Sequence, residues 1–167
     1  MMERDERSAR ASVYAEKLAR MIRVRTVQEP GNARSFEDFH ALLEELFPAV
    51  FERCELKMFG SDGGSLLFCW HSACADEEKQ PALLLMSHQD VVDAEGPWTH
   101  EPFGGEIAEG RVWGRGTLDI KGNLLCILQA LEELIEVGFS PAFDIYVASS
   151  DREEIRGNDL VPSYLKE

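Results

Sequence analysis

Apolar residues recur at every third or fourth position in three stretches of the chain, and this spacing predicts three amphipathic helices. The first helix is expected over residues 9–24, the second from Ser35 to near Pro48, and the third over residues 120–137. In the third stretch the leucines form a stripe along one side of the helix, and Cys126 lies among them. We therefore expect this helix to contribute its leucines and Cys126 to the hydrophobic core.

Other stretches have the pattern of β-strands. Residues 54–58 alternate between apolar and polar side chains, and residues 65–70 follow after a glycine-rich turn, which predicts an antiparallel hairpin. Residues 82–86 and 143–148 are apolar at nearly every position, as in strands that are buried on both faces of a parallel sheet. Because a predicted helix lies between them, these two strands form a βαβ crossover. The expected fold is α/β: a three-layer α/β/α arrangement with a twisted, mostly parallel sheet and helices on both faces.

Composition limits what the protein can be. With 167 residues and 44% hydrophobic residues, the chain is expected to fold as one domain with a true core. It has 17 Lys and Arg against 31 Asp and Glu, a net charge of −14, which argues against binding to nucleic acid or to an anionic membrane. The four cysteines show no CxxC spacing and are expected to be reduced thiols. A charged start and the lack of a long apolar run predict neither secretion nor a membrane span, so the expected location is the cytoplasm.

Five residues with metal-binding side chains follow the predicted strands or precede the third helix. His88 and Asp90 come directly after the first apolar strand, Glu153 and Glu154 come after the second, and Asp119 lies in the loop that enters the helix. Open α/β sheets bind ligands beyond the carboxyl ends of their strands, where such loops converge. Imidazole and carboxylates without a nearby thiolate suit zinc or a similar divalent ion. The sequence thus predicts a metal site at this edge of the sheet.

Spacing also suggests how these side chains divide the work. Residues two apart in extended chain point the same way, so Asp90 can accept the spare ring N–H of His88 and fix its tautomer. A single carboxylate in the middle loop is a candidate to bridge two ions, which favours Asp119 for that position. Adjacent side chains in a loop diverge, so one of Glu153 and Glu154 can bind metal while the other accepts a proton from the attacking water.

Taken singly, each of these features has a simpler interpretation. A histidine after a strand is usually only a loop residue. Two glutamates at a helix start are usually there because the helix dipole stabilises negative charge. Gly-Arg-Gly at residues 114–116 is usually a turn. Joint placement at one sheet edge is what favours a site. The other histidines have no partners that single them out as ligands: His40, His71 and His100. A nucleotide site is disfavoured because neither a GxGxxG nor a GxxxxGK[ST] motif stands at a strand-to-helix turn.

The motifs as a set resemble the di-zinc aminoacylase/carboxypeptidase family, which includes acetylornithine deacetylase, succinyl-diaminopimelate desuccinylase, aminoacylase and glutamate carboxypeptidase. The resemblance extends from the first helix to about Gly157. Gln89 and the pair Thr117-Leu118 are most similar to the Gly-X carboxypeptidase and N-acyl amino acid hydrolase branch. The segments that carry the likeness are Leu-Met-Ser-His-Gln-Asp-Val-Val at 85–92, Trp98, Pro102-Phe103, Gly-Arg-Gly-Thr-Leu-Asp-Ile-Lys-Gly at 114–122, and Glu153-Glu154.

This resemblance implies a role for each candidate residue. His88 would bind one zinc ion, Asp119 would bridge both ions, and Glu154 would bind the other. Glu153 would be the general base and acid, and Asp90 would orient His88. The reaction would be hydrolysis of an amide or peptide bond next to a free carboxylate, in a small peptide or an N-acyl amino acid, by a hydroxide that bridges the two zinc ions. Cobalt or manganese would be substitutes for zinc.

The chain also departs from the family. Members are typically more than twice as long, with an inserted dimerisation domain, a further carboxylate ligand and a late histidine ligand, none of which lies within these 167 residues. Residues 1–167 are therefore expected to be the N-terminal portion of the catalytic domain, with an incomplete zinc site and little activity alone. Arg152 replaces the usual aspartate beside Glu153, and a cation there would weaken the carboxylate as a base.

Two further expectations concern partners. An incomplete sheet leaves a strand edge and apolar surface uncovered, so we expect the chain to form homo-oligomers. A second hypothesis for the function is a non-catalytic α/β binding or regulatory module, derived from the same family, that uses its acidic strand-end face to contact a partner.

Overall fold

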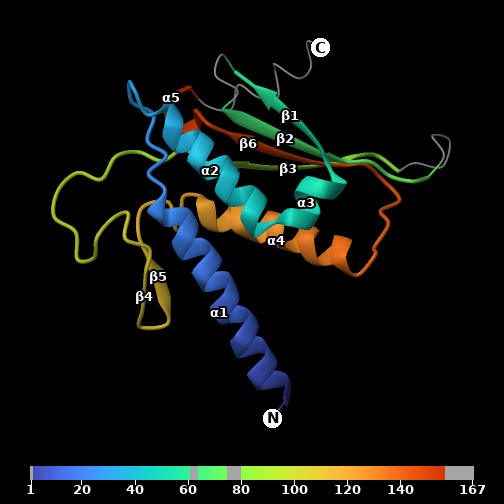
Figure 1. The fold of residues 1–167 in the computed structure, drawn as a ribbon, viewed down its shortest axis with the longest axis horizontal. Helices are drawn as coiled ribbons and strands as arrows, with labels where there is room; N and C mark the ends of the chain where they lie inside the picture. Colours follow the sequence, from blue (N-terminus) through green and yellow to red (C-terminus); the bar gives the residue numbers. More distant parts are fainter. Residues whose placement is uncertain (1, 61–63, 75–79, 157–167) are drawn as a thin grey trace.

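The computed structural model describes residues 2–60, 64–74 and 80–156, which form a four-stranded sheet, a separate two-stranded hairpin and five helices (Figure 1). The order of strands in the larger sheet is β1-β2-β6-β3. In chain order the elements are α1 (Met2–Arg23), α2 (Ala33–Leu46), α3 (Pro48–Arg53), β1 (Glu55–Phe59), β2 (Ser65–Trp70), β3 (Leu83–His88), β4 (Glu106–Ala108), β5 (Arg111–Trp113), α4 (Lys121–Glu136), β6 (Ile145–Ser150) and α5 (Glu153–Arg156).

The α/β class is confirmed, but the sheet is mixed where a mostly parallel sheet was predicted. β1 and β2 form the antiparallel hairpin that the alternating pattern indicated, with Glu55 opposite Cys69. β2 is also antiparallel to β6, and of the three pairings within this four-stranded sheet one is parallel, β3 with β6. This parallel pair and α4 between its strands are the predicted crossover. The apolar runs led to the prediction of a mostly parallel sheet. Such a run indicates only that a strand is buried, and burial does not distinguish a parallel neighbour from an antiparallel one.

Strand β3 is less buried than predicted. Leu83, Leu84 and Met86 are 40%, 44% and 46% exposed, whereas β6 is almost wholly buried. The physical reason is position, since in the described part of the chain β3 is the last strand of the sheet and has no neighbour on its outer side. Both strands carry the same kind of apolar run, so the sequence could not tell an edge strand from a central one.

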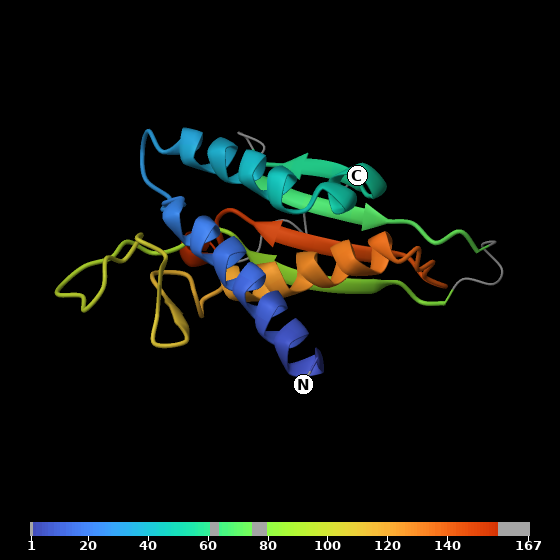
Figure 2. The same ribbon diagram turned by 60° about the horizontal axis from the view of Figure 1, so that its bottom comes forward.

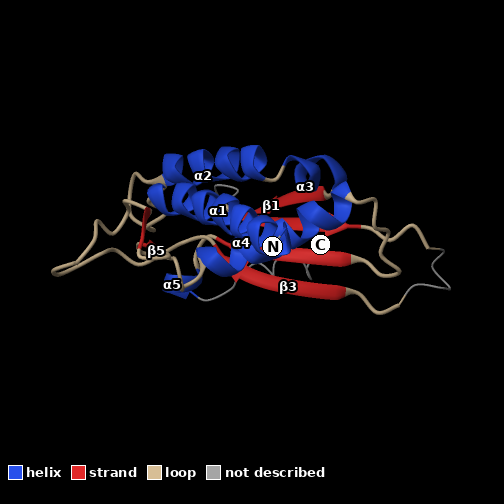
Figure 3. Cartoon of the chain, turned by 90° about the horizontal axis from the view of Figure 1, so that it is seen from below, coloured by secondary structure: helices blue, strands red, loops and turns tan. Residues whose placement is uncertain are grey.

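Helices α1 to α4 lie together on one face of the sheet (Figure 3). Their apolar sides meet side chains of β2 and β6, among them Phe68 and Val147, in the main core. A smaller cluster on the other face comprises Phe59, Leu67 and Ala148, with Cys69 beside them. The described residues thus form two layers, where three layers with helices on both faces were predicted.

The crossover helix α4 follows the prediction closely, with one exception. It spans Lys121–Glu136, and Gly138 beyond it has a φ of 74°, the left-handed conformation that commonly ends helices. Leu124, Leu125, Leu128 and Leu131 are buried as expected. Cys126, in contrast, is exposed and not part of the core. At 100° per residue, a position two residues before Leu128 faces away from the stripe.

Helix α1 is longer than the predicted segment and crosses α4 (Figure 2). Its C-terminal half packs on the core through Ala19, Met21 and Ile22, whereas residues 7–13 are exposed. No helix in the described ranges combines the length and the apolar composition that crossing a bilayer requires. Helix α2 begins at Ala33, two residues before the predicted start, and Asn32 precedes it without a side-chain capping bond.

A buried carboxylate joins α4 to α3. The side chain of Glu132 is buried, and its two oxygens accept the backbone N–H groups of Ala49 and Val50 at 3.0 and 2.9 Å. These donors belong to the first turn of α3, where N–H groups have no partner within the helix. Pro48 begins that helix and has no N–H to satisfy.

Replacing Glu132 should therefore destabilise the fold. Glu132→Ala leaves the buried N–H of Val50 and the half-buried N–H of Ala49 without acceptors. We expect it to lower the free energy of unfolding by about 3 kcal/mol, because hydrogen bonds to a charged group are worth roughly 1.5–3 kcal/mol each. Urea unfolding followed by circular dichroism measures the change. Glu136→Ala, an exposed glutamate of the same helix, is the matched control and should change stability by less than about 0.5 kcal/mol.

The edge of β3 makes a second prediction. Unpaired main-chain groups beside exposed Leu84 and Met86 favour pairing with another chain. We expect the purified chain to self-associate and Met86→Lys, which places a charge on this edge, to shift it toward monomer. Light scattering after size exclusion gives the mass. Met58→Lys is the control, because Met58 is similarly exposed on β1, at the opposite edge. A monomeric unmodified chain would contradict the prediction.

Candidate metal site

The candidate site lies where the parallel strands β3 and β6 end side by side. Their register pairs His88 with Ser150, the last residue of each strand. The ladder continues for one step, since the N–H of Gln89 donates to the carbonyl of Ser150 at 2.8 Å. Both chains then turn away, one into Asp90 and the other into α5. The two sequence segments that supply candidate residues are thus fixed to each other by main-chain bonds before any side chain contributes.

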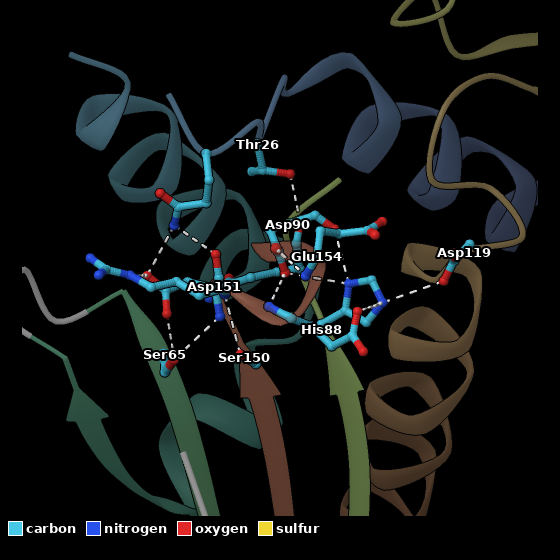
Figure 4. A network of polar contacts seen from close by, with 12 residues as sticks. Thr26, Ser65, His88, Asp90, Asp119, Ser150, Asp151 and Glu154 are labelled. Carbon is cyan, nitrogen blue, oxygen red and sulfur yellow. Dashed lines mark hydrogen bonds and ion pairs between the residues drawn. The ribbon is translucent and has the colours of Figure 1, made fainter. Parts of the chain in front are cut away.

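His88 stands between two sets of carboxylates (Figure 4). Its ring Nδ1 lies 3.0 Å from the backbone carbonyl of Asp90 and 3.4 Å from the Asp90 carboxylate. Its Nε2 lies 3.3 Å from Oδ1 of Asp119 and 3.6 Å from Oε2 of Glu153. Because a carbonyl can only accept, Nδ1 is the nitrogen that carries a proton, and Nε2 is the one available to bind a cation.

Three of the predicted residues converge closely enough to share a metal ion. One ligand atom each from His88, Asp119 and Glu154 lies within 4.8 Å of the other two. They come from three separate parts of the chain: the end of β3, the loop before α4, and α5. His88 is buried, Glu154 is half-buried and the Asp119 side chain is 73% exposed, so the cluster opens to solvent on the Asp119 side.

Asp90 does more than the sequence indicated. It is fully buried, and its two carboxylate oxygens accept the backbone N–H groups of Glu153 and Glu154 at 3.2 and 3.0 Å. One carboxylate therefore contacts the His88 ring and also holds the start of α5, which carries both glutamates. No sequence pattern indicates this second contact, because it depends on how the chain turns at the end of β6.

Charge in the cluster is strongly negative. Burial alone would lower the pKa of His88, but hydrogen bonds to Asp90 and the charges of Asp90 and Glu153 outweigh it and raise the pKa to about 9. Burial raises the pKa of Glu154, and the neighbouring charge of Asp119 adds to that effect. At neutral pH the imidazole of the metal-free chain is therefore protonated, and a metal ion would have to displace that proton.

A second buried carboxylate, which the sequence analysis missed, holds the glutamate segment from the other side. Asp151 accepts the hydroxyl of Ser65 at 2.6 Å and the side-chain amide of Gln28 at 3.2 Å. A Cβ at Gly64 would lie 2.2 Å from the Asp151 carboxylate, so only glycine fits there. Arg152, which was expected to act on Glu153, has its Nε 3.3 Å from the Asp151 carboxylate instead.

The remaining histidines have other partners. His100 stacks on Trp113, with ring centroids 4.2 Å apart, and its Nδ1 lies 2.8 Å from the Glu106 carboxylate. The Nε2 of His71 lies 3.0 Å from Glu55, at the far end of the sheet, and the ring of His40 contacts the side chain of Gln89. In the described ranges the cluster around His88 is the one set of three or more side chains that could hold a metal.

One separation between ligand atoms is compatible with a shared divalent ion of the size of zinc. Tetrahedral zinc bonds of about 2.0–2.1 Å place two ligand atoms about 3.3 Å apart, and Nε2 of His88 and Oδ1 of Asp119 are separated by 3.3 Å. The peripheral contacts fit as well, because metal-binding histidines usually donate their other ring N–H to a carbonyl or carboxylate. The Nδ1 of His88 contacts the carbonyl of Asp90 in this manner.

Comparison with known sequences identifies relatives of the chain. Residues 84–163 match the sequence model of a protein family described as "Peptidase family M20/M25/M40". The chain is 39% identical over 126 residues to a probable carboxypeptidase S-like 2 of Dictyostelium discoideum, an alignment that covers 74% of this chain and 23% of that protein. It is 36% identical over 130 residues to an N-fatty-acyl-amino acid synthase/hydrolase of Danio rerio, with coverages of 77% and 25%. Carboxypeptidase S of Saccharomyces cerevisiae is 32% identical over 157 residues, with coverages of 85% and 26%.

Solved structures share the fold. Human carnosine dipeptidase 1 superimposes with a TM-score of 0.70 at 16% identity, covering 96% of this chain and 36% of that one. An M20 family metallo-carboxypeptidase from Sulfolobus solfataricus gives a TM-score of 0.66 at 18% identity, with coverages of 85% and 31%. At this level of identity the likeness concerns the fold alone.

Each of the three sequence relatives extends well beyond the aligned region, since the chain spans about a quarter of their length. The matched segment runs from β3 across the loop that carries Asp119 to the glutamate pair and beyond, so it includes every residue of the candidate site. The sequence comparisons agree with one another, and residues 84–163 belong to peptidase family M20/M25/M40.

Proposed function

We propose that this chain is part of a metal-dependent hydrolase that cleaves an amide or peptide bond next to a free carboxylate, in a small peptide or an N-acyl amino acid. The observation that carries the proposal is the convergence of His88, Asp119 and Glu154 ligand atoms within 4.8 Å. The names of the relatives support the substrate class, because they include carboxypeptidases and N-fatty-acyl-amino acid hydrolases.

The residues divide into metal ligands and groups that act on water or on other residues. In the proposal His88 would hold one zinc ion, Glu154 would hold a second, and Asp119 would be a ligand shared by both. Two divalent ions bound there would polarise the substrate carbonyl and lower the pKa of a bound water. Asp90 keeps the Nε2 of His88 directed at the ion through its contacts with Nδ1. Cobalt and manganese are suitable substitutes, since both accept imidazole and carboxylate ligands.

Glu153 is the proposed general base. Its carboxylate lies 3.6 Å from Nε2 of His88 and 43% of its side chain is exposed, so it reaches both the cluster and the solvent. It would accept the proton of the attacking water and pass it to the leaving amine. Arg152 directs its Nε to Asp151.

Among the residues that the structure describes, the cluster has one histidine and two carboxylates for two ions, whereas a catalytic zinc ion usually has about three protein ligands. We therefore infer that residues 1–167 are the N-terminal portion of the catalytic domain, and that the chain alone binds metal more readily than it turns over substrate. The alternative, a non-catalytic module, predicts that activity stays absent even when a downstream segment is supplied and that Glu153→Gln has no effect, so these two results separate the hypotheses.

The first experiment measures zinc binding by isothermal titration calorimetry. We expect the chain to bind zinc, and His88→Ala and Asp119→Ala each to weaken it at least about a hundredfold, because losing even an outer partner of a ligand costs about 10–100-fold. His100→Ala is the matched control: this ring also contacts a carboxylate but lies outside the cluster, so zinc affinity should not change. If the chain takes up no zinc, the proposed function fails.

The second experiment separates the two adjacent glutamates. Glu154→Gln removes a proposed ligand and should weaken zinc binding at least tenfold, whereas Glu153→Gln should leave zinc affinity within about threefold. Any hydrolysis of an N-acyl amino acid by the chain should fall about 10²–10⁴-fold in Glu153→Gln, the usual loss when a general base is removed. The reverse order of zinc affinities would exchange the roles of Glu153 and Glu154.

A further inference from the structure

The end of α1 and the residues after it touch both loops that bring metal ligands to the site. We call residues 21–27 the platform. It is in contact with the turn that carries Asp119 through Lys121, and with the loop after His88 through Thr26.

Lys121 ties the Asp119 turn to the platform. Its side chain is fully buried, and Nζ donates to the carbonyls of Met21 and Val24 at 3.0 and 2.7 Å while it lies 4.6 Å from the centre of the Phe39 ring. Carbonyls in the last turn of a helix have no partner within it, and an ammonium group satisfies them well. Among the residues that the structure describes, Lys121 forms no ion pair with a carboxylate. Its bonds are directed at the end of α1.

The turn that holds Asp119 is closed by the same residue. The backbone N–H of Lys121 donates to the carbonyl of Gly116 at 2.8 Å, so Asp119 lies within a short loop with both ends fixed. Gly116 has a φ of 87°, and a Cβ there would come within 2.8 Å of the Val91 side chain. The turn thus packs directly against the residue that follows Asp90.

Thr26 ties the His88 loop to the platform. Its hydroxyl donates to the carbonyl of Gln89 at 2.5 Å, and its own carbonyl accepts the N–H of Val91 at 3.0 Å. Val27 and Val91 form a parallel bridge beside these bonds. Thr26 is fully buried, so its hydrogen bonds have no competition from water. The two residues it binds are on either side of Asp90.

We propose that the platform sets the separation of His88 and Asp119, and that Lys121 and Thr26 are positioning residues for the metal site. The two ligands are 31 positions apart in the sequence. The loop after His88 and the turn that holds Asp119 are both hydrogen-bonded to the same seven-residue segment, residues 21–27. The inference rests on the proposed function where it concerns metal, but the platform itself is a property of the metal-free chain.

Charge and positioning predict opposite effects for Lys121. If its ammonium group acted on the site only through its charge, removing it would reduce repulsion of the metal ions and tighten binding. If it positions Asp119, removing it loosens the turn and weakens binding. The direction of the change therefore tests the proposal.

The test compares two variants with two matched controls. Lys121→Met removes the ammonium group but keeps an apolar stem, and Thr26→Val removes the hydroxyl at nearly constant volume. Lys17→Met is the control for the first, because Nζ of Lys17 also donates to a helix-end carbonyl, that of Leu46 at 2.8 Å, and lies 4.6 Å from a phenylalanine ring, that of Phe47. Ser72→Ala is the control for the second, since its hydroxyl donates to a carbonyl at the far end of the sheet.

Two measurements are made on each protein. Hydrogen exchange without metal, followed by mass spectrometry, should show faster exchange in peptides covering residues 88–92 and 114–124 for both variants and for neither control. Titration with Co²⁺, followed by its visible absorption, should show affinity about 10–100-fold weaker and an altered band shape in both variants, with controls unchanged.

Each outcome decides something different. If the two variants exchange faster but the unmodified chain takes up no cobalt, the platform is supported and the metal proposal is overturned. Unchanged exchange in Thr26→Val and Lys121→Met overturns the platform, as does tighter cobalt binding in Lys121→Met. Should Lys121→Met fail to fold, Thr26→Val carries the test alone, because it removes one hydroxyl group only.

Discussion

The site depends on the parallel pairing of β3 with β6. Main-chain bonds between these strands set their carboxyl ends side by side, and Gln89 extends the ladder by one more bond to Ser150. From that point His88 faces the start of α5, which carries the two glutamates. To enter β6 parallel to β3, the chain must cross back from the carboxyl ends of the strands to their amino ends. The crossover helix α4 makes this return, so it begins near the edge where His88 lies. Asp119, just before that helix, is brought to the site by topology.

Much of this could be anticipated from the sequence, for identifiable reasons. The crossover has a strong helical stripe between two apolar runs, and His88, Asp119 and Glu154 stand where such runs and stripes begin or end. What could not be anticipated depends on long-range neighbours. The exposed face of β3 and the antiparallel partner of β6 are set by strand order, which no local pattern encodes. The two buried aspartates, Asp90 and Asp151, act through backbone N–H groups and hydroxyls that sequence does not display.

Buried charges have a common use in this molecule. Glu132 binds the first N–H groups of α3, Asp90 binds those of α5, and Lys121 binds the last carbonyls of α1. In each case a full charge meets helix-end groups of the opposite partial charge, which lowers the cost of burying it. The helices are thereby fixed at their ends, where orientation matters most. Two of the three contacts lie at the metal site, and the third lies between α3 and α4.

Gly64 and Asp151 are far apart in the sequence but lie against each other in the fold. A single methyl group at position 64 would collide with the carboxylate that secures the glutamate segment, although the two positions are 87 residues apart. Substitutions next to the β1–β2 hairpin would thus disturb the candidate metal site, as changes at His88, Asp119 or Glu154 would. Their effect would be that of an ill-formed centre in a chain that otherwise remains folded. A substitution so far from the site in sequence is easily mistaken for one that destabilises the whole fold. The collision at position 64 instead gives it a local effect on the Asp151 carboxylate.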